Sequence, residues 1–120
     1  MVSKYHSKRV ITSDGVFDSK REFIRWCELK QKQQNGEIQS LQRQVRFELI
    51  PAIYAPDVIG KRGGRKRGAL LERKAVYIAD FVYTENGEKV VEDVKGLRTK
   101  DYILKRKLLL WRYGIQIRET

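Results

Sequence analysis

The chain has few of the residues that most catalytic and structural sites need. Cys27 is the only cysteine among 120 residues, so no internal disulfide can form, and His6 is the only histidine. A zinc site built from cysteine and histidine is therefore excluded, and so are nearly all mechanisms in which histidine is the acid or base. The sequence also contains no apolar run near the roughly 20 residues of a membrane span, and no signal-peptide segment. We expect a cytoplasmic protein without membrane contacts.

Negative charge is also scarce. Fifteen Asp and Glu residues stand against 26 Lys and Arg residues, which gives a formal net charge of +11. Hydrophobic residues make up 41% of the chain, enough for the small core of one domain covering residues 1–120. Such a charge balance favours polyanions, and nucleic acid is the first candidate. A basic binding protein without any chemistry fits these numbers equally well.

Capping residues predict two helices. Ser19, with Glu22 three residues later, forms a capping-box pattern, and we expect the helix that it opens to end near Asn35. Thr99 can cap a second helix, which we expect to stop at Gly114.

Turn signals between β-prone runs predict the strands. The clearest is Asn86-Gly87, which separates residues 74–84 from residues 89–95 and indicates a tight hairpin. We also expect a hairpin within residues 8–17, strands at 45–50 and 115–118, and a loop from Ala55 to Gly68. These elements predict an α/β or α+β fold with a central mixed sheet flanked by helices.

The predicted hairpin brings two acidic residues together. A two-residue turn at Asn86-Gly87 places Asp80 directly opposite Asp93, on one face of the ladder, where like charges repel. Two opposed carboxylates suit a hard divalent cation such as Mg²⁺. Lys95 shares the face of Asp93, whereas Glu92 points to the other side. On residue types alone, a solvated hairpin face with an ordinary ion pair is about as compatible.

These residues resemble the D…(D/E)xK motif of the PD-(D/E)XK nuclease superfamily, with Asp80 on one strand and Asp93-Val94-Lys95 on the next. An upstream helix that carries Glu22 is similar to the arrangement in archaeal-type Holliday junction resolvases and in the endonuclease subunit of some transposases. More closely, the chain resembles small phage endonucleases of a resolvase-like family. The matching segments span nearly the whole chain and are Phe17–Glu22, Ile78–Phe81, Val91–Gly96, Thr99-Lys100 and the Lys-Arg-Lys helix that follows.

The resemblance implies a restriction-endonuclease-like core and a metal-dependent endonuclease that cuts branched DNA in the host cytoplasm. It implies that Asp80 and Asp93 hold Mg²⁺, which Mn²⁺ can replace, with the Val94 carbonyl as a further ligand. Glu22 completes the site directly or through a water molecule, although the capping box also explains a glutamate there. Lys95 orients or activates the attacking water. A nuclease with another DNA substrate (transposase-like, flap-cutting or nicking) and a non-catalytic DNA-binding module are the alternatives.

Basic residues outside the motif predict the DNA contacts. Five of the seven residues in 61–67 are basic, and the two glycines among them let the backbone approach phosphates. The predicted DNA-binding residues are Lys61, Arg62, Arg65, Lys66, Arg67, Lys100 and Lys105. A solvated surface is the alternative for both groups. Gln42 or Gln44 could support the site from the preceding strand.

The second predicted helix carries more apolar residues than one core-facing stripe needs. A four-way junction is resolved by two cuts, and the chain has one predicted site. We therefore expect a homodimer whose interface includes apolar residues of this helix or of the neighbouring strands.

Overall fold

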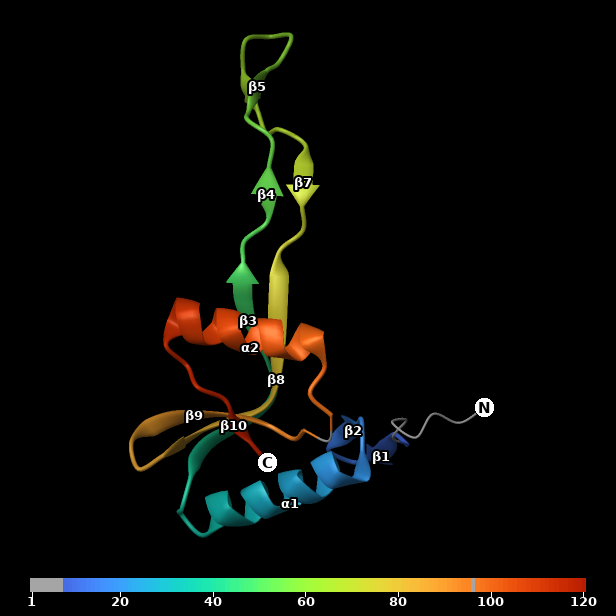
Figure 1. Cartoon of the computed structure of the whole chain (residues 1–120), viewed down its shortest axis with the longest axis vertical. Coiled ribbons are helices and arrows are strands. Elements are labelled where there is room, and N and C mark those ends of the chain that lie inside the picture. The colour runs from blue at the N-terminus through green and yellow to red at the C-terminus, as the bar shows by residue number, and fades with distance from the viewer. Residues whose placement is uncertain (1–7, 96) are drawn as a thin grey trace.

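A computed structural model describes residues 8–95 and 97–120 (Figure 1). Gly96, at the end of the motif segment Val91–Gly96, lies outside the described residues. The chain folds into two helices around a four-stranded mixed sheet, as the sequence predicts. The sheet runs in the order β10-β9-β8-β3, and its strands are β3 (Gln39–Ile50), β8 (Ala75–Glu85), β9 (Glu88–Asp93) and β10 (Arg118–Glu119).

Both helices begin and end at the predicted residues. Ser19 caps α1 (Lys20–Gln34), and its Oγ accepts a hydrogen bond from the Glu22 backbone N–H at 3.1 Å. Thr99 caps α2 (Lys100–Tyr113) in the same way, and Gly114 ends that helix with φ = 67°. None of the helices in the described part of the chain is long and apolar enough to cross a membrane.

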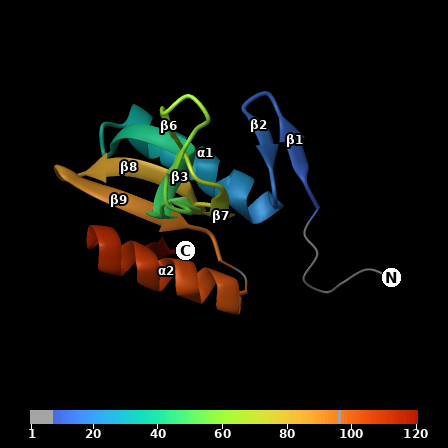
Figure 2. The ribbon, with the colours of Figure 1, turned by 90° about the horizontal axis from the view of Figure 1, so that it is seen from above.

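The helices cover opposite faces of the sheet, and each encloses a core (Figure 2). The core under α2 consists of Phe47, Leu49, Tyr77, Ala79, Val82, Val91, Tyr102, Leu109 and Ile117. The core under α1 is smaller and consists of Leu29, Ile38, Phe81 and Tyr83.

The two cores meet at a break in the alternation of β8. Ala79 packs under α2 and Phe81 under α1, although residues two apart in a strand normally share a face. The ladder pairs on either side place Gln44 of β3 opposite Asp80 at this break. Gln44 has φ = 55°, a left-handed conformation that costs a non-glycine residue on the order of 1 kcal/mol. Backbone strain is therefore stored directly beside the predicted site.

Two expectations for the β-structure are wrong. Strand β3 begins at Gln39 rather than at residue 45. Its pairing with β8 stabilises residues 39–44 as a strand, although most of these residues are polar. The predicted loop Ala55–Gly68 belongs to a two-stranded extension of β3 and β8 (Figure 1), called the arm here and comprising residues 53–72. Its short strands are β4 (Ile53–Tyr54), β5 (Val58–Ile59), β6 (Arg65–Lys66) and β7 (Leu70–Glu72).

The remaining strands follow the sequence more closely. The hairpin of β1 (Val10–Thr12) and β2 (Gly15–Phe17) lies within the expected residues. The final strand, β10, starts at Arg118 rather than at residue 115, and it pairs in parallel with β9.

The first prediction concerns Glu119, which ties β10 to α2. Its carboxylate accepts hydrogen bonds from Arg98 and from the Tyr102 hydroxyl, which lies 2.7 Å away, and these bonds lower the pKa of Glu119 to about 2. A depressed pKa in the folded state stabilises the fold above the ordinary value of 4.5, and this stabilisation is lost as the pH falls towards 2.

Glu119→Gln should therefore lower the urea midpoint of unfolding most near pH 7, and the difference from wild type should shrink between pH 5 and pH 2. Glu88→Gln, at the exposed hairpin turn, is the matched control and should change the midpoint little at any pH. A constant deficit for Glu119→Gln across this range would show that the carboxylate charge does not contribute.

Candidate functional site

The β8–β9 hairpin follows the predicted register. Phe81 pairs with Glu92, so the next positions, Asp80 and Asp93, face each other where β9 ends. Asp93 is 2% exposed. Burial, the hydrogen bond between the two carboxyl groups and the charge of Asp93 raise the pKa of Asp80 far above its ordinary value. The pair therefore needs a shared proton or a bound cation to offset its repulsion.

Neighbouring groups hold this pair in place. The Tyr77 hydroxyl donates to Asp93 Oδ2 at 2.8 Å, and burial together with the Asp93 charge raises the pKa of Tyr77, so the phenol remains a donor. The Val94 backbone N–H donates to Asp80 Oδ2, also at 2.8 Å. Each carboxylate is thus oriented by a separate donor, while further oxygen lone pairs remain for a ligand.

Lys95 extends along the same face as Asp93. Its Nζ lies 3.0 Å from Asp93 Oδ2 and 4.2 Å from the centre of the Tyr102 ring. The side chain is 26% exposed, so the amine is positioned by a carboxylate and an aromatic ring but still reaches solvent. A cation held in this way can contact an anionic group that approaches the carboxylates.

Glu22 approaches the pair from the first turn of α1. It is 4% exposed, and its Oε1 accepts a hydrogen bond from Gln44 Nε2 at 3.3 Å. The guanidinium of Arg43 lies 3.8 Å from the same oxygen. Burial and the nearby charge of Asp18 raise the pKa of Glu22, and the charge of Glu22 in turn raises that of Asp80.

The structure thus gathers the four predicted catalytic residues, Glu22, Asp80, Asp93 and Lys95, at the meeting point of β8, β9 and the α1 N-terminus. Within residues 8–95 and 97–120, no group of three or more histidine, cysteine, aspartate or glutamate residues is arranged as a metal cluster. Asp80 and Asp93 form a pair, and Glu22 stands further off. The oxygens of two adjacent carboxyl groups are nevertheless the donors that a hard divalent cation prefers.

Three supporting residues emerge from the structure. Sequence reasoning missed Tyr77, because ordinary alternation puts it on the face away from Asp80, and only the break in β8 brings its hydroxyl to Asp93. It also missed Arg43, and no pattern in the sequence singles it out. The two glutamines considered are both exposed, and Gln44 donates a hydrogen bond to Glu22.

The predicted DNA-binding residues divide into two groups. Lys61, Arg62, Arg65, Lys66 and Arg67 are all exposed on the arm, which stands away from both helices (Figure 1). Lys100 and Lys105 lie on α2, where Lys105 Nζ is 3.5 Å from Asp101. The basic residues of the arm are therefore separate from the carboxylates. The two lysines of α2 lie on the same helix as Tyr102, whose ring contacts Lys95.

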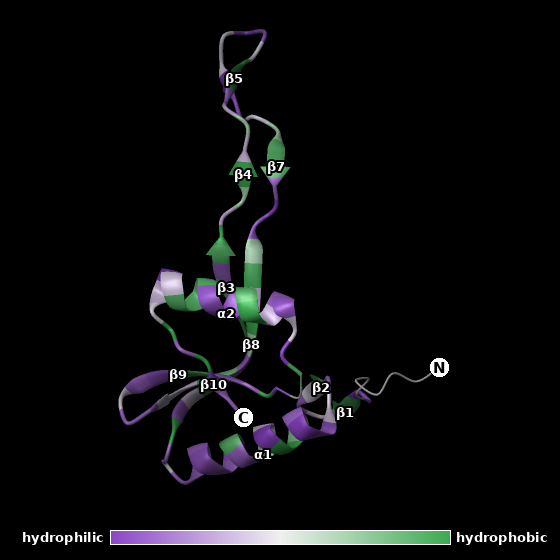
Figure 3. Cartoon of the chain, viewed as in Figure 1, coloured by the Kyte–Doolittle hydropathy of each residue, from purple (hydrophilic) through white to green (hydrophobic). Residues whose placement is uncertain are grey.

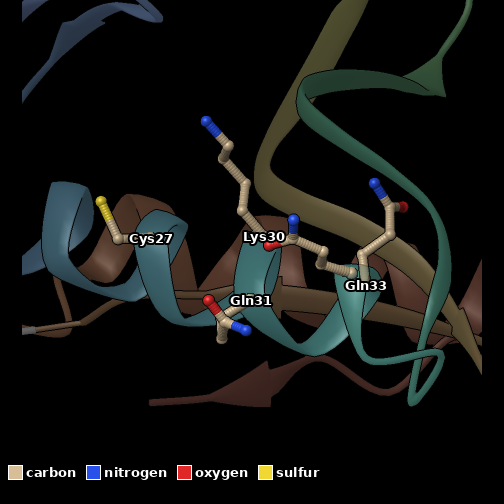
Figure 4. A pocket seen from close by; sticks show the side chains of 5 residues that line it. Cys27, Lys30, Gln31 and Gln33 are labelled. Carbon is tan, nitrogen blue, oxygen red and sulfur yellow. The ribbon is translucent and has the colours of Figure 1, made fainter.

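A pocket of about 520 Å³ lies elsewhere, on the outer side of α1 (Figure 4). Its lining is Cys27, Lys30, Gln31, Gln33 and Gln34, and none of these is a predicted site residue. Lys30 Nζ already pairs with Asp14 at 2.7 Å. The pocket therefore adds nothing to the carboxylate site.

Comparison with known proteins places the chain in one family. No curated protein and no solved structure is significantly similar to it. Residues 2–120 match the family described as "Protein of unknown function (DUF1064)". Since this match spans nearly the whole sequence, the chain belongs to the DUF1064 family.

Proposed function

We propose that the chain is a metal-dependent endonuclease of the PD-(D/E)XK superfamily that hydrolyses phosphodiester bonds in branched DNA, such as a four-way junction. The observation that carries this proposal is the pairing of half-buried Asp80 with buried Asp93, with Lys95 Nζ 3.0 Å from Asp93. The net charge of +11 supports nucleic acid as the substrate.

The carboxylate pair suits a bound Mg²⁺, which Mn²⁺ can replace. In the proposed site Asp80 and Asp93 hold the ion, and the Val94 carbonyl and Glu22 complete the set of oxygen donors. When bound, the ion supplies a Lewis acid that polarises the phosphate and favours deprotonation of a water molecule. The support is the cost of two carboxylates in contact, which a divalent cation offsets.

The remaining residues position the reacting groups. Lys95 orients the attacking water and stabilises the charge that develops on the phosphate. Tyr77 fixes the Asp93 carboxylate, and Gln44 fixes Glu22, through the hydrogen bonds described above. We assign Lys100 and Lys105, on α2, to contacts with the DNA backbone beside the site.

Two other functions remain as alternatives. A nuclease of the same type could cut flaps or nick duplex DNA, because the carboxylate site carries no information about DNA branching. A non-catalytic DNA-binding module is the other, but a binder that relies on positive charge gains nothing by placing a half-buried carboxylate beside a buried one. The geometry therefore favours an enzyme.

A homodimer fits the resolution of a junction by paired cuts. Helix α2 exposes four large apolar residues, Leu104, Leu110, Trp111 and Tyr113, and Trp111 is 81% exposed. Leu104 and Trp111 are seven residues apart and so share one side of the helix. We propose that this surface, the α2 patch, pairs two copies of the chain.

Asp80→Asn tests the metal site. It should abolish cleavage and leave DNA binding nearly unchanged. Because it removes the half-buried carboxyl group that repels buried Asp93, it should also raise the free energy of unfolding without metal by about 1 kcal/mol or more. Mg²⁺ should raise the Tm of the wild type but not that of Asp80→Asn. The control is Glu88→Gln, at an exposed position, which should match the wild type throughout.

The assay uses a synthetic four-way junction beside a linear duplex of the same sequence, with and without Mg²⁺. Preferential cutting of the junction supports the proposed substrate, and equal cutting supports another DNA substrate. Binding without cleavage in the presence of Mg²⁺ or Mn²⁺ would support the alternative that the protein is a non-catalytic DNA-binding module. Wild-type cleavage by Asp80→Asn would contradict the site assignment.

Lys95→Ala tests the role of the amine. We expect turnover to fall by about 100-fold or more, as is typical when a group that acts on the reacting atoms is lost. The dependence of DNA affinity on salt concentration should not change, because Lys95 pairs with Asp93 rather than with the DNA backbone. A fall in affinity as large as the fall in turnover would make Lys95 a binding residue only.

The α2 patch is tested by the double variant Leu104→Ser/Trp111→Ser. The wild type should be a dimer by light scattering across a range of concentrations, and the variant a monomer with similar circular dichroism. Leu97→Ser, an exposed apolar residue outside α2, is the control and should leave the dimer intact. If the wild type is monomeric both free and on junction DNA, this result would contradict the proposal that two copies of the chain make paired cuts.

A further inference from the structure

The arm makes the molecule far more elongated than its length requires. Beyond Ile50 and Ala75 the two strands continue as a ribbon, with β4 paired to β7 and β5 paired to β6 (Figure 1). The longest extent of the molecule is 61 Å, and the radius of gyration is 19.2 Å. A compact chain of this length has a radius of gyration of about 14 Å. The arm therefore extends into solvent rather than folding onto the domain.

At the tip of the arm, neither face resembles a surface that packs on a protein core. At its tip Val58 pairs with Lys66, and Ile59 pairs with Arg65. Because directly paired residues share a face, each face of the tip presents one apolar and one basic side chain. Hydrophobic and hydrophilic segments alternate along the ribbon of the arm (Figure 3). An isolated two-stranded ribbon is marginally stable in water, so a partner that contacts both faces would stabilise it.

The charge of the arm identifies the partner. Between Asp57 and Glu72 the sequence holds five basic residues and no acidic one. A second copy of a chain with a net charge of +11 would repel this segment, whereas a nucleic acid backbone would attract it. At the apex, Lys61 and Arg62 lie in a tight turn that is closed by the Gly60 N–H, which donates to the Gly64 carbonyl at 2.7 Å.

We propose that the arm is a preformed β-ribbon that enters the major groove of a duplex, at a distance from the phosphate that is cut. The major groove is wide enough for a two-stranded ribbon, whose two mixed faces then meet its two walls. The inference rests on the proposed function only for the choice of DNA as the polyanion.

The length of the arm sets the spacing between the two contacts. From Asp80 along β8 and β7 to Arg65 the chain spans 15 residues. At about 3.3 Å per residue this is at most about 50 Å, which corresponds to about 15 base pairs at 3.4 Å each. The arm thus acts as a ruler that selects substrates with more than about one helical turn of duplex beside the cut.

Two glycines allow the shape of the arm to be tested apart from its charge. A Cβ on Gly68 would lie 2.2 Å from the Ala55 carbonyl oxygen and 2.4 Å from that of Pro56, so Gly68→Ala forces the two strands apart. A Cβ on Gly64 would meet no atom within 4 Å, so Gly64→Ala leaves the ribbon intact. Both variants retain every basic side chain.

The experiment measures fluorescence anisotropy with duplexes of 8 to 24 base pairs in metal-free buffer, so that no DNA is cut. The affinity of the wild type and of Gly64→Ala should rise steeply once the duplex exceeds about 10 to 15 base pairs. Gly68→Ala should lose about tenfold in affinity on long duplexes, together with the length dependence. Replacing all five basic arm residues by alanine should cause the same loss of affinity and of length dependence. It should also reduce the slope of log affinity against log salt concentration by the contribution of up to five phosphate contacts.

The Tm of each variant controls for folding, and it should stay near that of the wild type because the arm lies outside both cores. Wild-type binding by Gly68→Ala would show that a flexible cationic loop suffices and would overturn the ribbon. Unchanged binding by the five-alanine variant would overturn any DNA contact by the arm. Guanine N7 left unprotected from methylation would overturn the major-groove placement.

These outcomes separate the two proposals. Arm-dependent binding without cleavage in Mg²⁺ would overturn the endonuclease and leave the ribbon. Cleavage of a junction whose duplex arms are all 8 base pairs, at the rate seen with 24, would overturn the ruler and leave the endonuclease.

Discussion

The arrangement of the molecule depends on how two adjacent acidic residues are buried. Glu92 and Asp93 both end β9, and they are 0% and 2% exposed on opposite faces of the sheet. Arg25 neutralises Glu92 with two hydrogen bonds, of 2.7 and 3.0 Å, and the Tyr83 hydroxyl donates a third at 2.6 Å. Although burial opposes it, these bonds lower the pKa of Glu92. Asp93 instead faces another carboxylate.

This difference fixes the geometry of the site. Because Arg25 reaches Glu92 from α1, the helix is held against the sheet about one turn after its N-terminus. Glu22, three residues before Arg25, is thereby directed at Gln44 and the Asp80 region. Its backbone N–H still binds the Ser19 cap, so the capping and the site interpretations of this glutamate hold together.

Local signals in the sequence were sufficient for the two helices, for the β8–β9 hairpin and for the pair of acids. The caps at Ser19 and Thr99 and the turn at Asn86-Gly87 are short-range features, and the hairpin register follows from the turn alone. The position of Tyr77 was not predictable, because it depends on the break in alternation opposite Gln44. That break is a property of three paired strands rather than of any one segment.

The arm was missed for a related reason. Its glycines and its one proline, Pro56, are typical of a loop, and its strands are only two or three residues long. They pair because the ends of β3 and β8 lie side by side in the sheet. The arm strands that continue from these ends are therefore already adjacent. The pairing within the arm therefore cannot be predicted from its own sequence before the register of β3 and β8 is known.

The ribbon has a consequence for the protein in the absence of any partner. Each of its two strands has one side whose backbone N–H and C=O groups pair with no other strand of the arm, and such open edges invite other chains to add to them. Charged side chains on an edge oppose this association, and their repulsion reaches about 10 Å at 0.1 M salt and about 3 Å at 1 M. The cations that suit the arm to a phosphate backbone therefore also keep free molecules apart, and concentrated salt removes that protection.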